Sequence, residues 1–226
     1  KPLYGSVRVG GAKNASYKLM LAALLADTPS RILNFSHISD VHLVARLINS
    51  LGAKAAQVGE RAYVIDPQGL AKDEIDPSSG EASRASTMFI PALLAKFGRA
   101  VVPFPGGDKI GARPLDRHFD GLRALGAEIT AENDKIIVTA PQLRGATYRF
   151  SKSTHTGTET LLLAAVKAKG TTILENAALE TEIDDLISFL NSMGAKISRR
   201  PNRVIEIVGV PKLHGAIHRI MSDHNQ

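Results

Sequence analysis

Three short polar segments of the chain have the residue types needed to bind an anion. They are residues 10–14, 83–87 and 154–158, with the sequences Gly-Gly-Ala-Lys-Asn, Ser-Arg-Ala-Ser-Thr and Thr-His-Thr-Gly-Thr. Each precedes an apolar run typical of a buried helix, and the free N–H groups at a helix start favour negative charge. Taken singly, each segment also fits an ordinary cap or turn. Three such starts, two of them carrying Lys13 and Arg84, favour an anionic ligand.

A fourth segment, residues 104–114, combines flexibility with charge. It holds three glycines and two prolines in eleven positions and lies between a predicted strand and a predicted helix. As a plain connection, it would use Asp108 as a turn residue. As a functional segment it is a lid that carries one carboxyl group, with Arg113 to bind an anion. For Asp108 to act as an acid its pKa must rise from about 3.9, and burial would raise it while Lys109 and Arg113 oppose the rise.

A threefold internal repeat must position these segments. A helical pattern ends three times in a similar cassette, Leu-Gly-Ala-Lys at 51–54, Leu-Gly-Ala-Glu at 125–128 and Met-Gly-Ala-Lys at 193–196. A β-branched run follows each cassette, and an apolar helix with its own strand precedes it. The unit therefore reads strand, buried helix, strand, amphipathic helix, strand, strand, over roughly 70 residues.

These units predict one α/β domain covering residues 1–226. Its three βαβαββ repeats, at about 4–68, 69–141 and 142–212, would surround a pseudo-threefold axis. A unit of this size cannot bury an all-apolar helix alone, so we expect these helices in the middle with the sheets around them. The amphipathic helices are expected to face solvent on one side.

Composition limits the possible partners. The hydrophobic fraction is 44% with only 5% aromatic residues, which indicates an aliphatic core. The net charge of +6 suggests an anionic partner, but nucleic acid is not expected because basic residues are not interleaved with exposed aromatics. No apolar run approaches the ~18 residues of a membrane span and no leader opens the sequence, so the expectation is a cytoplasmic protein without a membrane partner.

Cysteine is absent, which excludes a disulfide framework, a thiolate zinc site and a thiol nucleophile. Acid–base chemistry would therefore fall to Asp, Glu, His or Lys. We expect neither a metal nor a cofactor. The run Ser222-Asp223-His224 is interpreted as chance composition, because a hydrolytic triad is assembled from separated positions.

Two motifs carry a family resemblance: Gly-Ala-Lys-Asn-Ala at 11–15, followed by Gly-Ala-Arg-Pro-Leu-Asp-Arg-His at 111–118. With Glu-Asn-Ala-Ala at 175–178, they make the whole chain similar to the UDP-N-acetylglucosamine 1-carboxyvinyltransferases. These enolpyruvyl transferases open peptidoglycan synthesis. The resemblance implies a fold of two similar domains, each built of three repeats, with the active site in the cleft between them. This chain resembles one domain, so the second domain is an expected partner.

The resemblance also implies a role for each matched residue. Enolpyruvyl transfer begins when phosphoenolpyruvate is protonated at its methylene carbon and the sugar 3-hydroxyl attacks the neighbouring carbon. The adduct then loses phosphate and leaves an enolpyruvyl ether. The substrates are therefore phosphoenolpyruvate and UDP-N-acetylglucosamine. The implied ligands are Lys13, Arg84 and Arg113 for phosphoenolpyruvate, Asn14 for the sugar, and Pro114, Leu115, Asp116, Thr154, Thr156 and Gly157 for the uridine diphosphate, with His118 closing the second motif.

Asp108 matches the position where many relatives carry the cysteine alkylated by fosfomycin. A carboxyl group there can still donate a proton, so Asp108, Lys13 and Arg113 are the expected catalytic residues. The base of the family reaction is implied to lie in the second domain. We therefore expect this chain to be inactive alone.

Two other functions remain open at this stage. One is a 5-enolpyruvylshikimate-3-phosphate synthase-like transferase, although that family usually opens with Ser-Lys-Ser rather than the Ala12-Lys13-Asn14 found here. The other is a non-catalytic module that binds a nucleotide sugar, which the aspartate at 108 keeps possible. Retention of both Lys13 and Arg113 favours an enzyme.

Overall fold

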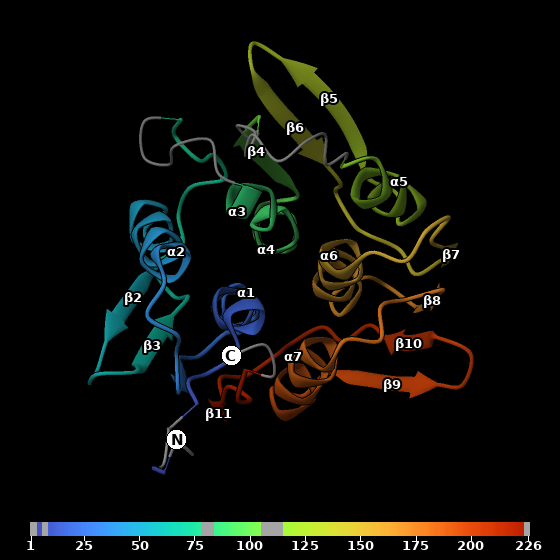
Figure 1. Cartoon of the computed structure of the whole chain (residues 1–226). Coiled ribbons are helices and arrows are strands. Elements are labelled where there is room, and N and C mark those ends of the chain that lie inside the picture. Colours follow the sequence, from blue (N-terminus) through green and yellow to red (C-terminus); the bar gives the residue numbers. More distant parts are fainter. Residues whose placement is uncertain (1–3, 6–8, 78–83, 105–114, 224–226) are drawn as a thin grey trace.

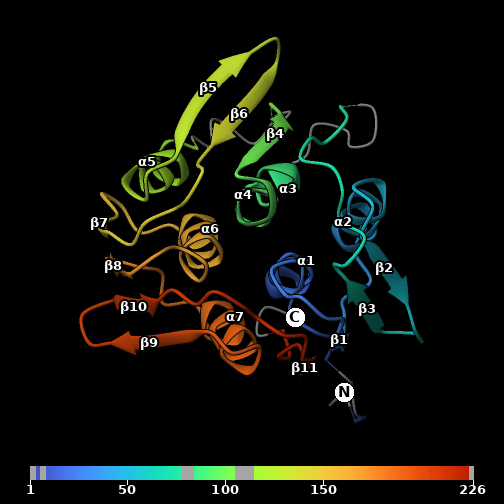
Figure 2. The ribbon, with the colours of Figure 1, turned by 180° about the vertical axis from the view of Figure 1, so that it is seen from behind.

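The chain folds into three sheets that surround a group of helices. The computed structural model describes residues 4–5, 9–77, 84–104 and 115–223, with Arg84 described in its backbone only. Figure 1 shows the helices in the middle and the three hairpins on the outside, and the reverse view in Figure 2 shows the same arrangement. The predicted α/β architecture, with helices inside and sheets outside, is confirmed.

Each sheet is centred on the hairpin that follows a cassette. In all three, the strand after the buried helix pairs antiparallel with the second hairpin strand. The first sheet contains β1 (Ser30–Leu33), β2 (Lys54–Gln57) and β3 (Ala62–Asp66), the second β4 (Arg99–Pro103), β5 (Glu128–Glu132) and β6 (Lys135–Thr139), and the third β7 (Thr147–Arg149), β8 (Thr171–Glu175), β9 (Lys196–Arg200) and β10 (Val204–Val208).

The helices fall into the two classes that the sequence predicts. Those buried on nearly all sides are α1 (Lys13–Ala23), α4 (Ile90–Phe97), which follows the short α3 (Arg84–Thr87), and α6 (His155–Ala165). Those with one exposed face are α2 (Ser39–Ser50), α5 (Asp116–Ala124) and α7 (Thr181–Ser192). A helix without a polar face must be surrounded by protein, which explains why α1 and α6 lie at the centre of Figure 1.

The cassette glycines end the helices of the second class. Gly52, Gly126 and Gly194 have φ values of 97°, 92° and 100°. These left-handed conformations cost little only for a residue without a Cβ. The chain can therefore turn at once into the first strand of the hairpin, which is the physical basis of the repeated cassette.

The first sheet is completed by a segment remote in sequence. β11 (Ile217–Arg219) pairs parallel with β1, with Arg31 opposite Ile217 and Leu33 opposite Arg219. In the third sheet, β7 holds the corresponding parallel position beside β8. In the second, the described residues form only an isolated parallel bridge between Glu74 and Val101. The end of the described chain is thereby brought to the start of α1.

A glycine allows α5 to lie close against α6. A Cβ built on Gly121 would collide with the buried side chain of Leu161. We expect Gly121→Ala to lower the free energy of unfolding by about 1 kcal/mol, because overpacking by about 1–3 kcal/mol outweighs the better helix propensity of alanine. Urea unfolding measures this change. Arg123→Ala, an exposed substitution on the same helix, is the control, and an equal or smaller effect of Gly121→Ala would contradict the close packing.

Candidate functional site

The start of α1 is held by the far end of the chain. The backbone N–H of Ala12 donates to the carbonyl of Met221 at 2.8 Å, and the N–H of Lys13 donates to Asp223 Oδ2 at 3.0 Å. No side chain of α1 caps its own first turn. The carboxylate of Asp223 supplies that cap, since the first N–H groups of a helix have no intrahelical acceptor.

The two predicted ligands on α1 are accessible. Lys13 and Asn14 are both exposed, whereas Gly11 and Ala12 before them are buried. Gly11 packs so closely on the backbone carbonyl of Asn34 that a Cβ there would overlap the oxygen. The closely packed turn at Gly11 therefore places the ammonium group of Lys13 and the amide of Asn14 at the exposed start of α1.

The start of α6 is ordered by its own threonines. Thr154 Oγ1 accepts from the N–H of Gly157 at 3.3 Å, as an N-cap residue does. A Cβ on Gly157 would collide with the Thr154 side chain, so the predicted Thr154–Gly157 segment needs glycine there. Thr158 Oγ1 donates to the Thr154 carbonyl at 2.8 Å and accepts from the N–H of Ala178 at 3.1 Å. The segment is thereby tied to the loop after β8.

A side-chain contact joins the starts of α5 and α6. His118 Nε2 and Thr156 Oγ1 lie 2.9 Å apart, and His118 is only 6% exposed. Asp116 is exposed at the first position of α5, after the half-buried Leu115. The segments around Leu115 and Thr156, both predicted to bind the uridine diphosphate, are about 40 positions apart in the sequence. The contact between His118 and Thr156 brings them together.

Other predicted residues lie outside what the structure describes. Asp108, Arg113 and Pro114 fall in the undescribed segment 105–114. The backbone of Arg84 begins α3, but its side chain is not described. The proposed acid and two of the three proposed cations therefore remain predictions.

A buried ion pair that the sequence reasoning missed connects α1 with α6. Lys18 Nζ lies 3.3 Å from Glu159 Oε2, and the two side chains are 3% and 0% exposed. Burial alone would lower the pKa of Lys18, but the charges of Glu159, Tyr17 and Glu182 together outweigh this and the pKa is raised. Burial raises the pKa of Glu159, while the charges of Lys18 and His155 oppose the rise.

Two signals could have revealed the missed residues. Lys18 and Glu159 stand just before the apolar runs of two buried helices, at the sixth position of α1 and the fifth of α6. Buried opposite charges are normally paired. Asp223, by contrast, has no local signal, because its contact with Lys13 spans 210 positions. The interpretation of the run at 222–224 as chance composition rather than a hydrolytic triad stays a prediction, but it overlooked the role of Asp223 at the start of α1.

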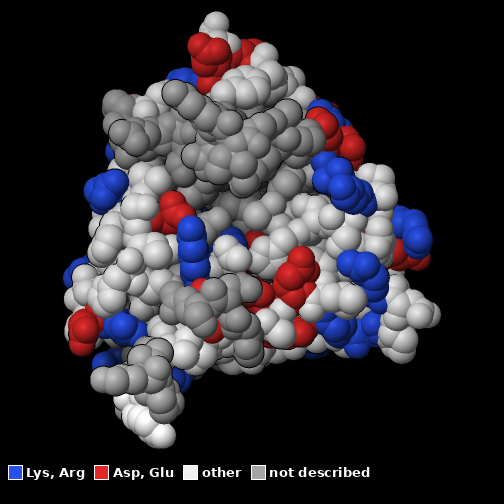
Figure 3. All heavy atoms as spheres, viewed as in Figure 1, with Lys and Arg blue, Asp and Glu red and all other residues white. Residues whose placement is uncertain are grey.

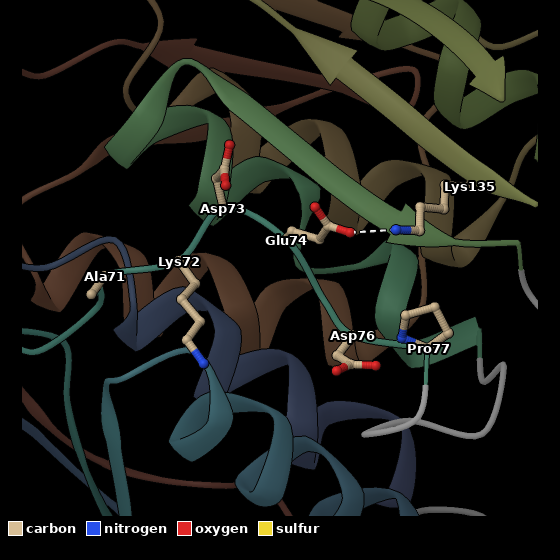
Figure 4. A pocket seen from close by; sticks show the side chains of 7 residues that line it. All are labelled: Ala71, Lys72, Asp73, Glu74, Asp76, Pro77 and Lys135. Carbon is tan, nitrogen blue, oxygen red and sulfur yellow. Dashed lines mark hydrogen bonds and ion pairs between the residues drawn. The ribbon is translucent and has the colours of Figure 1, made fainter. Parts of the chain in front are cut away.

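A pocket of about 490 Å³ lies elsewhere, beside β4 and β6 (Figure 4). Its lining contains none of the residues predicted to bind substrate. Two of its carboxylates are already in ion pairs, Glu74 with Lys135 at 2.5 Å and Asp73 with Arg99 at 2.7 Å. This pocket therefore lies apart from the predicted substrate-binding residues.

Neither a metal cluster nor a membrane span is found in the described part of the chain. Within residues 4–5, 9–77, 84–104 and 115–223, no three His, Asp or Glu side chains are grouped to hold a metal ion. No described helix is long and apolar enough to cross a bilayer. On the face seen in Figure 3, basic and acidic side chains of the described residues are interspersed.

The chain matches a known family along its whole length. A family model described as EPSP synthase (3-phosphoshikimate 1-carboxyvinyltransferase) matches residues 1–226. With the helix starts described above, this match defines a carboxyvinyltransferase-type domain, and the chain belongs to that family. Structural relatives agree on the fold: the enolpyruvyl transferase NikO from Streptomyces tendae has a TM-score of 0.84 at 21% identity, covering 98% of this chain and 52% of that one.

Curated relatives are closer in sequence and share one name. UDP-N-acetylglucosamine 1-carboxyvinyltransferase 3 of Caldanaerobacter subterraneus is 45% identical over 99% of this chain. UDP-N-acetylglucosamine 1-carboxyvinyltransferase 2 of Lactiplantibacillus plantarum is 43% identical over 99%, and the Bdellovibrio bacteriovorus enzyme is 43% identical over 98%. The chain covers 53% of each of these proteins, so it spans about half the length of the curated relatives it matches.

Proposed function

We propose that this chain forms one half of a UDP-N-acetylglucosamine 1-carboxyvinyltransferase. The observation that carries the proposal is the shared name of the curated relatives at 41–45% identity over nearly the whole chain. Solved structures of other enolpyruvyl transferases match at only 21% identity. The convergence of the α5 and α6 starts through His118 and Thr156 supports a binding site at that place.

Nucleotide-sugar binding is proposed for the starts of α1, α5 and α6. Asn14 would hydrogen-bond the sugar, and the N–H groups at the start of α6 would favour the diphosphate. Leu115 would contact the uridine. The ordered caps of α6 support this role, because a preorganised turn loses little entropy on binding.

Phosphoenolpyruvate is proposed to bind beside the nucleotide sugar. Lys13 acts as a point charge on the phosphate group of phosphoenolpyruvate. The guanidinium groups of Arg84 and Arg113 suit the planar carboxylate of the same substrate. Asp108 donates a proton to the methylene carbon, the sugar hydroxyl gives its proton to the base, and the sugar oxygen bonds to the neighbouring carbon. The adduct then loses phosphate together with a proton from the new methyl group, which restores the double bond of the enolpyruvyl ether. We propose that the second half found in the relatives, in the same polypeptide or supplied separately, completes the cleft and contains the base.

An amide-shift titration tests the proposed substrate. UDP-N-acetylglucosamine is expected to produce saturable shifts at Asn14, Leu115 and residues 154–157, whereas shikimate 3-phosphate produces none. The family model is named after an enzyme that acts on shikimate 3-phosphate. Shifts with shikimate 3-phosphate alone would therefore make that compound the proposed substrate. Shifts with neither ligand would reject nucleotide-sugar binding by this half.

Phosphate release then separates the enzyme from a binding module. A nucleotide-sugar module without chemistry would bind UDP-N-acetylglucosamine but release no phosphate from phosphoenolpyruvate when the second half of a relative is added. We expect release with both halves and none with this chain alone. Steady release by this chain alone would contradict the proposed division of the active site.

A further inference from the structure

The Lys18–Glu159 pair reaches the first turn of both helices that carry it. Lys18 Nζ donates to the backbone carbonyl of Asn14 as well as pairing with Glu159. On the other side, Glu159 Oε1 lies 3.7 Å from Nε2 of His155, the first residue of α6. A continuous series of polar contacts therefore runs from Asn14 through Lys18 and Glu159 to His155.

The direction of these contacts shows which ends of α1 and α6 lie together. Lys18 leans back four residues to Asn14, and Glu159 leans back four residues to His155. Side chains of a helix point toward its N-terminus. Because the two side chains meet, the first turns of α1 and α6 lie at the same end of the helix group. Both turns carry proposed ligands, Asn14 on one and Thr156 on the other.

The ion pair provides a direct link that other elements provide only indirectly. α7 packs against both α1 and α6 and contributes the buried Glu182, whose charge acts on both Lys18 and Glu159. It connects the two helices only through itself. An ammonium and a carboxylate held at 3.3 Å in an apolar interior are far less tolerant of displacement. The pair therefore joins the two helices directly, side chain to side chain.

Stability alone does not account for a charged pair at this place. Lys18 is 2% exposed and Glu159 0%, so both charges lose their hydration on folding. Well-packed apolar residues at such positions are often as stabilising or more so. What an apolar pair does not supply is a fixed relative position of the two helices.

We propose that Lys18 and Glu159, extended by His155, form a positioning unit that sets the spacing between the first turns of α1 and α6. The unit holds Asn14 at the separation from Thr154–Gly157 that one nucleotide sugar requires. This last step rests on the proposed function, whereas the coupling of the two helix starts does not.

The coupling is tested without any ligand. Backbone amide shifts are compared in Lys18→Met, Glu159→Gln and wild type, with Lys135→Met as the matched control from a half-exposed Lys–Glu pair. We expect each of the first two variants to shift the amides of both Asn14 and Gly157, and the control to shift neither. Changes confined to the substituted helix would overturn the coupling.

The effect on binding is tested in a variant that keeps its stability. Lys18→Met/Glu159→Met removes both charges and is expected to unfold at the same urea concentration as wild type or higher. Its affinity for UDP-N-acetylglucosamine should nevertheless fall roughly tenfold to a hundredfold, the usual consequence of misplaced binding groups. Wild-type affinity in this stable double variant would overturn the positioning role.

Failure of the proposed function gives a different pattern. If wild type does not bind UDP-N-acetylglucosamine, the nucleotide-sugar assignment fails, and the amide comparison still decides the coupling. If wild type binds and the double variant binds equally well, only the positioning role fails. A purely structural role for the pair would change the urea midpoint of the single variants without weakening binding in the double variant.

Discussion

Replacing Lys18 with methionine is expected to lower the free energy of unfolding by about 3–5 kcal/mol, the cost of breaking a buried ion pair from one side. The Glu159 carboxylate would keep its fully buried position without the ammonium group that now lies 3.3 Å away. Urea unfolding at neutral pH measures the loss. The half-exposed Lys135–Glu74 pair provides the control, since Lys135→Met should cost no more than about 1 kcal/mol.

The loss should depend on pH in a defined direction. Burial already raises the pKa of Glu159 above the ordinary value of 4.5, and without Lys18 the rise is larger. A carboxyl group with a higher pKa in the folded chain binds more protons when folded, so stability falls as pH increases from the unfolded pKa to the folded one. The Lys18→Met variant should therefore become less stable more steeply than wild type as pH rises above about 4.5.

Removing the Glu159 charge as well should reverse both the loss of stability and the added pH dependence of Lys18→Met. In Lys18→Met/Glu159→Gln, the fully buried carboxyl group of residue 159 no longer titrates, so the additional dependence on pH should disappear. Most of the lost stability should return as well. If the single variant is as stable as Lys135→Met and shows no added pH dependence, the charges are not buried as a pair.

The repeats made most of the fold predictable. The cassettes at 51–54, 125–128 and 193–196 placed the ends of α2, α5 and α7, because a glycine with positive φ is a local requirement. Apolar runs likewise located α1, α4 and α6. β11 was not predicted, because three residues carry too little pattern and their partner β1 lies about 186 positions away. The boundaries of the three repeats stay predictions.

The candidate site was predictable where polar residues start a helix. Lys13, Asn14 and Thr154–Gly157 stand at the starts of α1 and α6, where the sequence located them. The contact of His118 with Thr156 could not be predicted from spacing, since it depends on how closely Gly121 lets α5 approach α6. Asp223 was missed for the same reason, because long-range packing alone brings it to α1.

Asp223→Ala should therefore destabilise the start of α1, although no sequence pattern indicates a role for Asp223. The substitution removes the carboxylate that accepts from the N–H of Lys13 at 3.0 Å. A hydrogen bond to a charged group contributes about 1.5–3 kcal/mol, so we expect stability to fall by about 2 kcal/mol. The N–H of Lys13 should also exchange faster with solvent, which hydrogen exchange detects residue by residue.

Asp223→Asn separates the hydrogen bond from the charge. An asparagine keeps an oxygen that can accept from Lys13, so its cost should stay within about 1 kcal/mol, as amides cap helices about as well as carboxylates. Protection of the Lys13 amide should then remain near wild type. Equal losses in the alanine and asparagine variants would mean that the negative charge near Lys13, rather than the cap, is what Asp223 contributes. Because Lys13 and Asn14 begin α1, that result would make Asp223 an electrostatic partner of the proposed phosphate-binding lysine.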